Sequence, residues 1–361
     1  MENAKIKKVI EIIVPCYNES ACVELFYEKI TELFANTLTA YDYRLLFIDD
    51  GSGDDTLSKI KKLCEEDSED RLHYVSLSRN FGKEPAIYVG LSHATGDYVA
   101  VMDADLQHPP ELLPEMIRCI EEEGYDSCAA RRVNRKGEGV VRSFLSRTFY
   151  HVMNQLTGLG LMSGSTDYRL MTRQMTRAVV SLSERERFTK GIYNWVGFKT
   201  KWIPYQNVQR VAGTSKWSIS KLFNYASSGI IAFAATPLRA CVWLGMIIVI
   251  GAVVYGIDTA AKVLMHPENS NGRATIVLIM LFLGGVIITI LGMMGEYLAR
   301  IYMEVKQRPI YIVRESDLSM SDVTDGTRGT VSHLLARKER DELKELLEEI
   351  LEEKSKERQD K

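Results

Sequence analysis

Two long stretches without a charged residue constrain this chain more than any other feature. Residues 240–257 form an uncharged run of 18 residues and residues 274–295 a run of 22. A helix that crosses the hydrocarbon layer of a membrane needs roughly 20 apolar residues. Helices buried in a soluble core are the alternative, but such helices show an amphipathic period that these runs lack. We therefore expect a transmembrane hairpin over residues 239–300, with helices at about 240–261 and 274–298.

Basic residues flank the hairpin on the side of both chain ends. Lys216, Lys221 and Arg239 precede it, and Arg300, Lys306, Arg308 and Arg314 follow it, whereas the polar loop between the helices holds only Lys262 and Arg273. Because basic flanks stay in the cytoplasm, a multi-pass inner-membrane protein with both termini cytoplasmic is predicted. Residues 219–238 are predicted to form an amphipathic helix in the membrane interface. If that segment crossed the membrane instead, the C-terminal tail would lie outside.

Charge and cysteine usage exclude other classes. The 45 Lys and Arg residues against 48 Asp and Glu residues give a formal charge of −3, which argues against nucleic acid as a partner. The six cysteines show neither metal-ligand spacing nor a disulfide pattern, so a reducing compartment is expected. In the cytoplasmic segment 301–361, apolar residues at helical spacing predict a stripe that docks on a neighbouring subunit or on the catalytic domain, with a solvated helix as the alternative. A homo-oligomer is the expected assembly.

The first 218 residues read as one α/β domain with a largely parallel sheet. Apolar runs that predict strands alternate with amphipathic helical segments. The predicted strands are residues 9–14, 43–48, 72–77, 98–102 and 127–130. Each ends in a polar loop, and ligands of open α/β sheets bind at the carboxyl ends of the strands. We therefore expect these five loops to line one cleft.

Two aspartates follow the fourth predicted strand. Asp103 and Asp105 are placed on the same side of the chain by alternation, with no basic residue next to them in sequence. Paired carboxylates of this kind are costly to bury unless a cation lies between them. With Gln107 they form an oxygen-rich set suited to Mg²⁺ or Mn²⁺. His108 is adjacent but replaceable by water. Pro109 and Pro110 then predict the start of a helix that ends near Gly124.

The loops after the first two strands also offer polar side chains. Asp49 and Asp50 end the second strand and are expected to be free to hydrogen-bond a ligand, while Asp55 or Thr56 caps the following helix. After the first strand, the ring of Tyr17 is suited to stack on a nucleobase. The chain contains no GxxxxGK[ST] or GxGxxG pattern, so cationic side chains and a metal ion must neutralise phosphate.

Five motifs occur in an order that is typical of one enzyme family. They are VPCYNES, IDDGSGDDT, ATGDYVAVMDADLQHPP, GSTDYRLM and QRVAGTSKWS, and the two predicted membrane helices follow them. With these motifs the chain resembles the family 2 glycosyltransferases of GT-A fold. The likeness covers about residues 8–314. It is closest to the bacterial polyprenyl-phosphate glycosyltransferases such as the bactoprenol glucosyltransferases, and more distant to dolichol-phosphate mannose synthase.

This resemblance implies roles for individual residues. The implied nucleotide-sugar site consists of Pro15, Tyr17, Asn18, Glu19, Ile48, Asp50, Lys83, Asp103 and Ala104, and the implied metal ligands are Asp103, Asp105 and Gln107. Arg210 and Lys216 match a pair that grips the donor diphosphate. Arg131 and Arg147 match positions near the acceptor phosphate. Asp167 matches a carboxylate proposed as a base or as a group that orients the acceptor or the sugar. The implied catalytic set is Asp105, Asp167, Arg210 and Lys216.

The predicted function is inverting transfer of a hexose, glucose from UDP-glucose, to undecaprenyl phosphate at the cytoplasmic face of the membrane. Other donors, namely UDP-GlcNAc, UDP-galactose or GDP-mannose, are alternatives within the same fold. A processive polysaccharide synthase is disfavoured because the chain lacks a QxxRW motif. A non-catalytic nucleotide-sugar-binding membrane scaffold is the alternative that is not an enzyme.

Overall fold

The computed structural model describes residues 7–133, 153–185, 187–206 and 273–318, together with residues 148 and 151 and several positions between 243 and 258. Two compact units divide the chain. Residues 1–150, 160–216 and 307–361 form the first unit, and residues 151–159 and 217–306 form the second. The predicted interfacial segment 219–238 and residues 331–361, which hold the predicted apolar stripe, lie outside the described residues.

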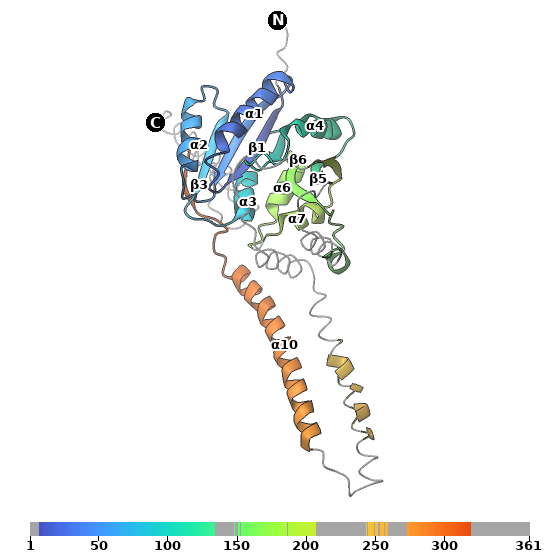
Figure 1. Cartoon of the computed structure of the whole chain (residues 1–361). Coiled ribbons are helices and arrows are strands. Elements are labelled where there is room, and N and C mark those ends of the chain that lie inside the picture. Colours follow the sequence, from blue (N-terminus) through green and yellow to red (C-terminus); the bar gives the residue numbers. More distant parts are fainter. Residues whose placement is uncertain are drawn as a thin grey trace, which may run out of the picture. The chain divides into compact units, whose positions relative to one another are not determined.

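Eight strands of the first unit form one mixed sheet (Figure 1). The strands are β1 (Val9–Cys16), β2 (Asp42–Asp49), β3 (Leu72–Leu77), β4 (Tyr98–Val101), β5 (Ser127–Arg132), β6 (Ser165–Thr172), β7 (Thr200–Tyr205) and β8 (Val313–Ser316). Their order across the sheet is β7-β5-β6-β4-β1-β2-β3-β8. The first five strands occur at the predicted positions, which confirms the α/β domain with a largely parallel sheet.

Three of these strands were not predicted from the sequence. β6 lies between β4 and β5 and is antiparallel to both. β7 is parallel to β5 and forms one edge of the sheet. β8, which follows the apolar segments in sequence, pairs antiparallel with β3 and forms the other edge. The chain that follows the apolar segments therefore completes the sheet of the first unit.

Helices cover both faces of the sheet. They are α1 (Val23–Asn36), α2 (Thr56–Glu66), α3 (Lys83–His93), the 3₁₀ turn η1 (Pro110–Leu112), α4 (Leu113–Glu121), α6 (Arg173–Ser181) and α7 (Thr189–Trp195). α1, α2 and α4 contribute buried side chains to a core with alternate residues of β1, among them Ile12. α3 packs on the opposite face, where a Cβ at Gly90 would lie 2.0 Å from a methyl carbon of Ile13. Only glycine permits this close approach of α3 to β1.

The structure tests two predictions about helix ends. The predicted helix after Pro109 and Pro110 occurs as η1 and α4, and Gly124 follows it with φ +70°. Asp55 is the N-cap residue of α2, as predicted, but its side chain makes no capping hydrogen bond. The carboxylate of Asp54 accepts instead from the N–H of Thr56, over 3.1 Å.

The second unit contains the long helix α10 (Arg273–Val305). Within α10, residues Phe282–Val305 are long and apolar enough to cross a membrane, with a mean hydropathy of 1.7 and no buried part. A shorter apolar helix spans Gly245–Tyr255. The isoleucines and leucines of α10 that the structure describes are mostly exposed, for example Ile288 at 71%. Such an apolar surface suits lipid rather than water.

Candidate active site

The carboxyl ends of three parallel strands lie side by side at one end of the sheet. β1 is hydrogen-bonded to β2 on one side and to β4 on the other, and all three run in the same direction. The loops that begin at Tyr17, Asp50 and Asp103 therefore leave neighbouring strand ends. Pro15 and Ile48, which the sequence assigns to the nucleotide site, are register partners just before these ends. An α/β sheet of this kind binds its ligands at the carboxyl ends of its strands.

Main-chain and side-chain hydrogen bonds tie two of these loops together. Asn18 has φ +52°, and its N–H donates to Ser52 Oγ over 3.0 Å. The Asn18 side-chain oxygen accepts from the N–H of Gly53 over 2.8 Å, and the N–H of Glu19 donates to Thr56 Oγ1 over 2.8 Å. Asn18 thus shapes the loop, while the ring of Tyr17 is 37% exposed beside it.

Asp49 and Asp50 are bound to the chain itself. Asp49 accepts from the Ser76 hydroxyl over 2.9 Å. The two carboxylate oxygens of Asp50 accept from the N–H groups of Phe81 and Gly82 over 2.7 and 2.9 Å. The expectation that both side chains are free for a ligand is therefore wrong, because Asp49 accepts from the Ser76 hydroxyl and the N–H of Ser52, and Asp50 accepts from main-chain donors of the next loop.

Burial raises the pKa of Asp50 to about 6, although the two N–H donors work against this shift. We call residues 15–19, 49–56 and 78–82 the donor rim, after the sugar donor, because several residues of the predicted nucleotide-sugar site lie in it. Gly51 is required in it, because its φ is +65° and a Cβ there would lie 2.5 Å from the carbonyl carbon of Arg79.

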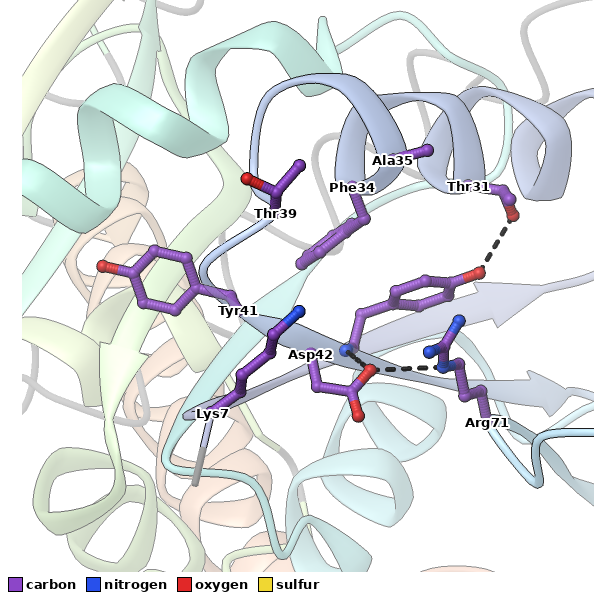
Figure 2. A pocket seen from close by; sticks show the side chains of 9 residues that line it. Lys7, Thr31, Phe34, Ala35, Thr39, Tyr41, Asp42 and Arg71 are labelled. Atoms are coloured by element: carbon purple, nitrogen blue, oxygen red, sulfur yellow. Dashed lines mark hydrogen bonds and ion pairs between the residues drawn. The ribbon is translucent and has the colours of Figure 1, made fainter. Parts of the chain in front are cut away.

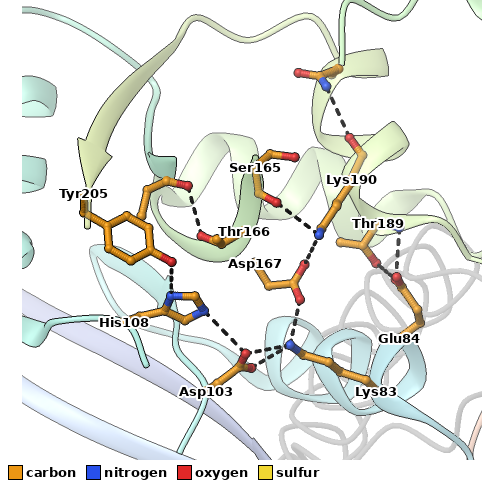
Figure 3. Close-up of polar contacts among 12 residues, drawn as sticks. Lys83, Glu84, Asp103, His108, Ser165, Thr166, Asp167, Thr189, Lys190 and Tyr205 are labelled. Atoms are coloured by element: carbon orange, nitrogen blue, oxygen red, sulfur yellow. Dashed lines mark hydrogen bonds and ion pairs between the residues drawn. The ribbon is translucent and has the colours of Figure 1, made fainter. Parts of the chain in front are cut away.

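A lysine lies beside the first carboxylate of the predicted metal motif. Lys83, the first residue of α3, contacts both oxygens of Asp103 over 2.7 and 2.8 Å (Figure 3). The same ammonium lies 2.7 Å from Asp167 Oδ2. No basic residue is next to these carboxylates in sequence, and α3 brings the cation from 20 residues away.

The position of Asp167 follows from the unpredicted strand. β6 runs antiparallel to β4, with Val101 opposite Arg169, so the continued register places Asp103 across from Asp167. A second ammonium, that of Lys190 on α7, lies 3.8 Å from Asp167 Oδ1. We call Asp103, Lys83, Asp167 and Lys190 the charge line.

The charges of the line hold one another ionised. Burial opposes ionisation of Asp167, but the ammonium groups of Lys190 and Lys83 outweigh it and lower its pKa to about 2. Partial desolvation likewise opposes the charge of Lys83, and the two carboxylates nevertheless raise its pKa above the ordinary range. Asp103 is half-buried, and although desolvation opposes its charge, Lys83 and His108 lower its pKa far below the usual value. At neutral pH, therefore, Asp167 is an anion that holds cations and accepts a proton poorly.

His108 supports the same site from the other side. Its Nε2 lies 3.6 Å from Asp103 Oδ2, and its Nδ1 lies 2.7 Å from the hydroxyl of Tyr205 at the end of β7. The sequence showed His108 only as a neighbour of the aspartate motif. The link to Tyr205 needed the position of β7, which no local pattern gives.

The remaining predicted metal ligands follow directly after Asp103. Asp105 is 7% exposed, and its Oδ1 accepts from the N–H of Gln107 over 3.1 Å. Ala104, between Asp103 and Asp105, is buried, and Leu106, between Asp105 and Gln107, has φ +53°. In the part of the chain that the structure describes, no group of three or more His, Cys, Asp or Glu side chains could hold a metal ion. Two carboxylates suit an ion that completes its shell with substrate phosphates and water.

The cationic residues predicted from the sequence are described only in part. Arg131, at the end of β5, donates from Nε to the carbonyl of Ser163 over 3.1 Å. Its guanidinium therefore supports the segment that leads into β6. Arg147, Arg210 and Lys216 lie outside the described residues.

A separate pocket lies away from these groups. It is lined by side chains of α1 and the start of β2, with Asp42 and Arg71 3.2 Å apart and Thr31 hydrogen-bonded to Tyr43 over 3.0 Å (Figure 2). Asp42 is the first residue of β2, so this pocket lies where the strands begin. The charge line lies at their opposite ends.

Comparisons with known proteins agree with this geometry. The profile of the family described as glycosyl transferase family 2 matches residues 11–180, and that of the GtrB C-terminal hairpin matches residues 236–301. The candidate glycosyltransferase CsbB of Bacillus subtilis is 46% identical over 317 residues, which cover 88% of this chain and 94% of that protein. The prophage-derived bactoprenol glucosyl transferase of Shigella flexneri is 37% identical over 85% of this chain and 98% of its own length.

A solved structure shows a more distant likeness. The glucosyl-3-phosphoglycerate synthase of Mycobacterium tuberculosis, crystallised with Mn²⁺, UDP and glucosyl-3-phosphoglycerate, is 18% identical with a TM-score of 0.45. The match covers 62% of this chain and 78% of that one.

Proposed function

Because this chain belongs to glycosyl transferase family 2 and carries a GtrB-type C-terminal hairpin, we propose that it transfers glucose from UDP-glucose to a polyprenyl phosphate. The family assignment confirms the resemblance and the GT-A fold inferred from the sequence motifs, and it makes the chain a glycosyltransferase. Bactoprenol glucosyl transferases that match along 98% of their length support the acceptor and the sugar. The sequence prediction of undecaprenyl phosphate is retained.

The observation that carries the proposal is that the donor rim and the charge line lie together at the carboxyl ends of the parallel strands. The donor rim offers an exposed ring at Tyr17, and the charge line offers fixed cations beside carboxylates. Transfer forms a bond from an acceptor phosphate oxygen to the anomeric carbon and breaks the bond from that carbon to the diphosphate. The departing diphosphate carries extra negative charge, which preorganised cations stabilise where it develops.

An acceptor phosphate changes what the site needs from Asp167. The phosphate is already an anion, so no strong base has to remove a proton from it. Asp167 is held ionised by Lys83 and Lys190. We therefore propose that Asp167 orients cations and substrate, and that the attack proceeds with inversion, because the carboxylates of Asp103 and Asp167 are engaged with lysines rather than placed as nucleophiles for double displacement.

A divalent metal fits the proposed donor site. Asp103 and Asp105 would hold Mg²⁺ or Mn²⁺, with Gln107 beside them, and the bound ion would stabilise negative charge on the diphosphate. Arg210 and Lys216 are proposed, from their motif alone, to grip the same diphosphate, and Arg147 the acceptor. Within the described chain, Lys83 is the cation that already contacts Asp103 and that balances its charge before a donor binds.

Membrane attachment suits a lipid acceptor. The hairpin match and the apolar helix α10 indicate a membrane-associated protein. We propose a two-helix hairpin with both termini and the catalytic domain on the cytoplasmic side, supported by the basic residues that flank it. The domain limits 1–218, 219–238, 239–300 and 301–361 and a homo-oligomeric assembly belong to the same proposal. A cysteine-accessibility scan of the loop 258–273 tests the orientation, since labelling from the cytoplasm would overturn it.

The decisive experiment combines purified full-length protein, undecaprenyl phosphate, Mg²⁺ and a panel of UDP- and GDP-sugars. We expect a glucosylated lipid with UDP-glucose. A lipid product with another sugar alone would replace the donor, and absence of product with every donor would overturn the proposed activity in favour of a nucleotide-sugar-binding scaffold.

Asp105→Ala is the variant that tests catalysis. We expect kcat to fall about a thousandfold because a ligand to the diphosphate-bound metal is lost. Glu123→Ala is the matched control, since Glu123 pairs only with Lys201 among its described ion pairs and is partly exposed. Equal rates for Asp105→Ala and the control would contradict the metal assignment.

A further inference from the structure

The charge line has a direction across the site. Starting from the donor rim, Asp103 is followed by Lys83, then by Asp167 and finally by Lys190 (Figure 3). Lys83 is held tightly, with contacts of 2.7 Å to both carboxylates. Lys190 lies 3.8 Å from Asp167, which is beyond hydrogen-bond distance. The line therefore ends in an ammonium whose ion pair is looser than the one within it.

Lys190 is placed there by the start of α7. The N–H of Thr189, the first residue of α7, donates to Glu84 Oε2 over 3.0 Å, and the Thr189 hydroxyl contacts the same carboxylate. Glu84 follows Lys83 directly on α3. Consequently α3 and α7 begin side by side across Asp167, and each presents its lysine to that carboxylate.

Two more contacts keep this arrangement. Lys190 Nζ donates to the carbonyl of Ser165, at the start of β6, over 3.2 Å. One turn further along α7, the ring of Tyr193 lies 3.6 Å from the guanidinium carbon of Arg169, which is buried on β6. α7 is thus fixed to β6 at two points. The Lys190 side chain remains 22% exposed.

We propose that Lys190 binds the phosphate group of the lipid acceptor. This inference rests on the proposed function and adds a residue that neither the sequence motifs nor the relatives assign. Inversion requires that the attacking oxygen and the departing diphosphate lie on opposite sides of the anomeric carbon. The donor diphosphate belongs to the Asp103 and Asp105 end of the site, so the acceptor phosphate belongs to the opposite end of the charge line, where Lys190 lies.

The chemistry of the ammonium fits this role. Lys carries three N–H donors on one ammonium group, and the Lys190 side chain is 22% exposed. A phosphate oxygen that approaches Lys190 can therefore bind it while Asp167 stays nearby, and Asp167 remains neutralised by Lys83. Arg131 donates to the carbonyl of Ser163, two residues before Ser165, so a second cationic side chain contacts the segment that leads into β6.

The test uses full-length protein in mixed micelles and measures initial rates against undecaprenyl phosphate and, separately, against UDP-glucose. For Lys190→Met we expect the KM for the lipid to rise about ten- to a hundredfold, the value of a charge-assisted hydrogen bond, with the KM for UDP-glucose unchanged. Lys190→Arg should recover most of the lipid affinity because it keeps the charge. Lys201→Met is the matched control, since Lys201 pairs with Glu123 at the surface, and it should behave as wild type.

The outcomes separate this inference from the proposed function. An unchanged lipid KM in Lys190→Met, or a rise in the donor KM instead, would overturn the role of Lys190 while leaving the glycosyl transfer intact. Absence of lipid product from the wild-type protein would overturn the proposed function itself. If the melting temperature of Lys190→Met falls, Lys190→Gln, which keeps a donor for the Ser165 carbonyl, is measured by the same criteria.

Discussion

The donor rim and the charge line lie at the same end of the sheet, yet different interactions fix their side chains. In the rim, side chains such as Asp50 and Asn18 accept from main-chain N–H groups. In the charge line, carboxylates and ammonium groups face one another at 2.7 to 3.8 Å. Main-chain hydrogen bonds fix a loop shape, whereas an ion pair can exchange a partner for a charged ligand. The rim is therefore the preformed part of the site, and the line is the part that responds to substrate.

This difference separates two kinds of variant. Changes in the rim are expected to act on stability, because they release buried donors or strain a loop. Changes in the charge line are expected to act on turnover, because they remove charges that the reaction uses.

The largest effect is expected for Lys83→Met, in the charge line. Loss of the ammonium leaves Asp103 and Asp167 facing one another without the cation between them. We expect kcat to fall about 10²–10³-fold, the range found when one preorganised charge-stabilising group is removed. Initial rates at saturating substrates measure this. Lys59→Met is the control because Lys59 pairs with Glu24 on the surface, and a wild-type kcat for Lys83→Met would refute a role of the line in turnover.

Gly51→Ala is the strongest test of the rim. A Cβ at this position meets the main chain of Arg79 at 2.5 Å in a residue with φ +65°, so the loop must shift. We expect a loss of about 2–3 kcal/mol in the free energy of unfolding. Thermal melts in detergent measure it. Gly53→Ala is a matched control, since nothing lies within 4 Å of its Cβ, and equal losses for both variants would contradict the steric argument.

The rim and the line also differ in how far the sequence predicts them. Strand ends and loops around Tyr17, Asp50 and Asp103 follow from local apolar runs and polar breaks, and the structure has these strands within two residues of the predicted ends. The partners of those residues do not follow, because Lys83, Asp167 and Lys190 come from elements that only the tertiary arrangement brings together. The sequence implied Asp167 and Lys83 through the family motifs, and it did not indicate Lys190.

The unpredicted strands explain this gap. β6 is antiparallel between β4 and β5, and its register is what sets Asp167 across from Asp103. β8 comes from beyond the apolar segments and pairs with β3, although it has only four residues. Short edge strands and long-range pairings carry little local signal, since their stability comes from neighbours that lie far away in sequence.

A pH test examines the buried carboxylate of the rim. Burial raises the pKa of Asp50 from 3.8 to about 6, so the folded protein keeps a proton on Asp50 that the unfolded chain has already released. The favourable contribution is complete below pH 3.8 and is lost as the pH rises through about 6. We expect the stability difference between wild type and Asp50→Asn to change by about 2–3 kcal/mol over this interval.

Melting temperatures of both proteins from pH 4 to 7 measure this effect. The wild type should lose stability relative to Asp50→Asn as the pH rises, because the Asn side chain cannot ionise. Glu32→Gln is the control, since Glu32 pairs with Lys29 on an exposed helix face. A difference between wild type and Asp50→Asn that does not vary with pH would show that the hydrogen bonds from Phe81 and Gly82 cancel the cost of burial.

The smallest effect is expected for a single ion pair that lies outside the charge line. Lys61 and Glu315 are 2.6 Å apart between α2 and β8, and both side chains are about one-third exposed. The buried ring of Tyr311, which lies 6.3 Å from that of Tyr88 on α3, anchors the same returning segment by packing. We expect Lys61→Met to lower the free energy of unfolding by about 0.5 kcal/mol, less at high salt, because water screens exposed charges. Thermal melts at two salt concentrations measure it. A loss of several kcal/mol would show that charge, and not packing, holds β8 to the sheet, and it would remove the distinction between an isolated ion pair and the linked pairs of the charge line.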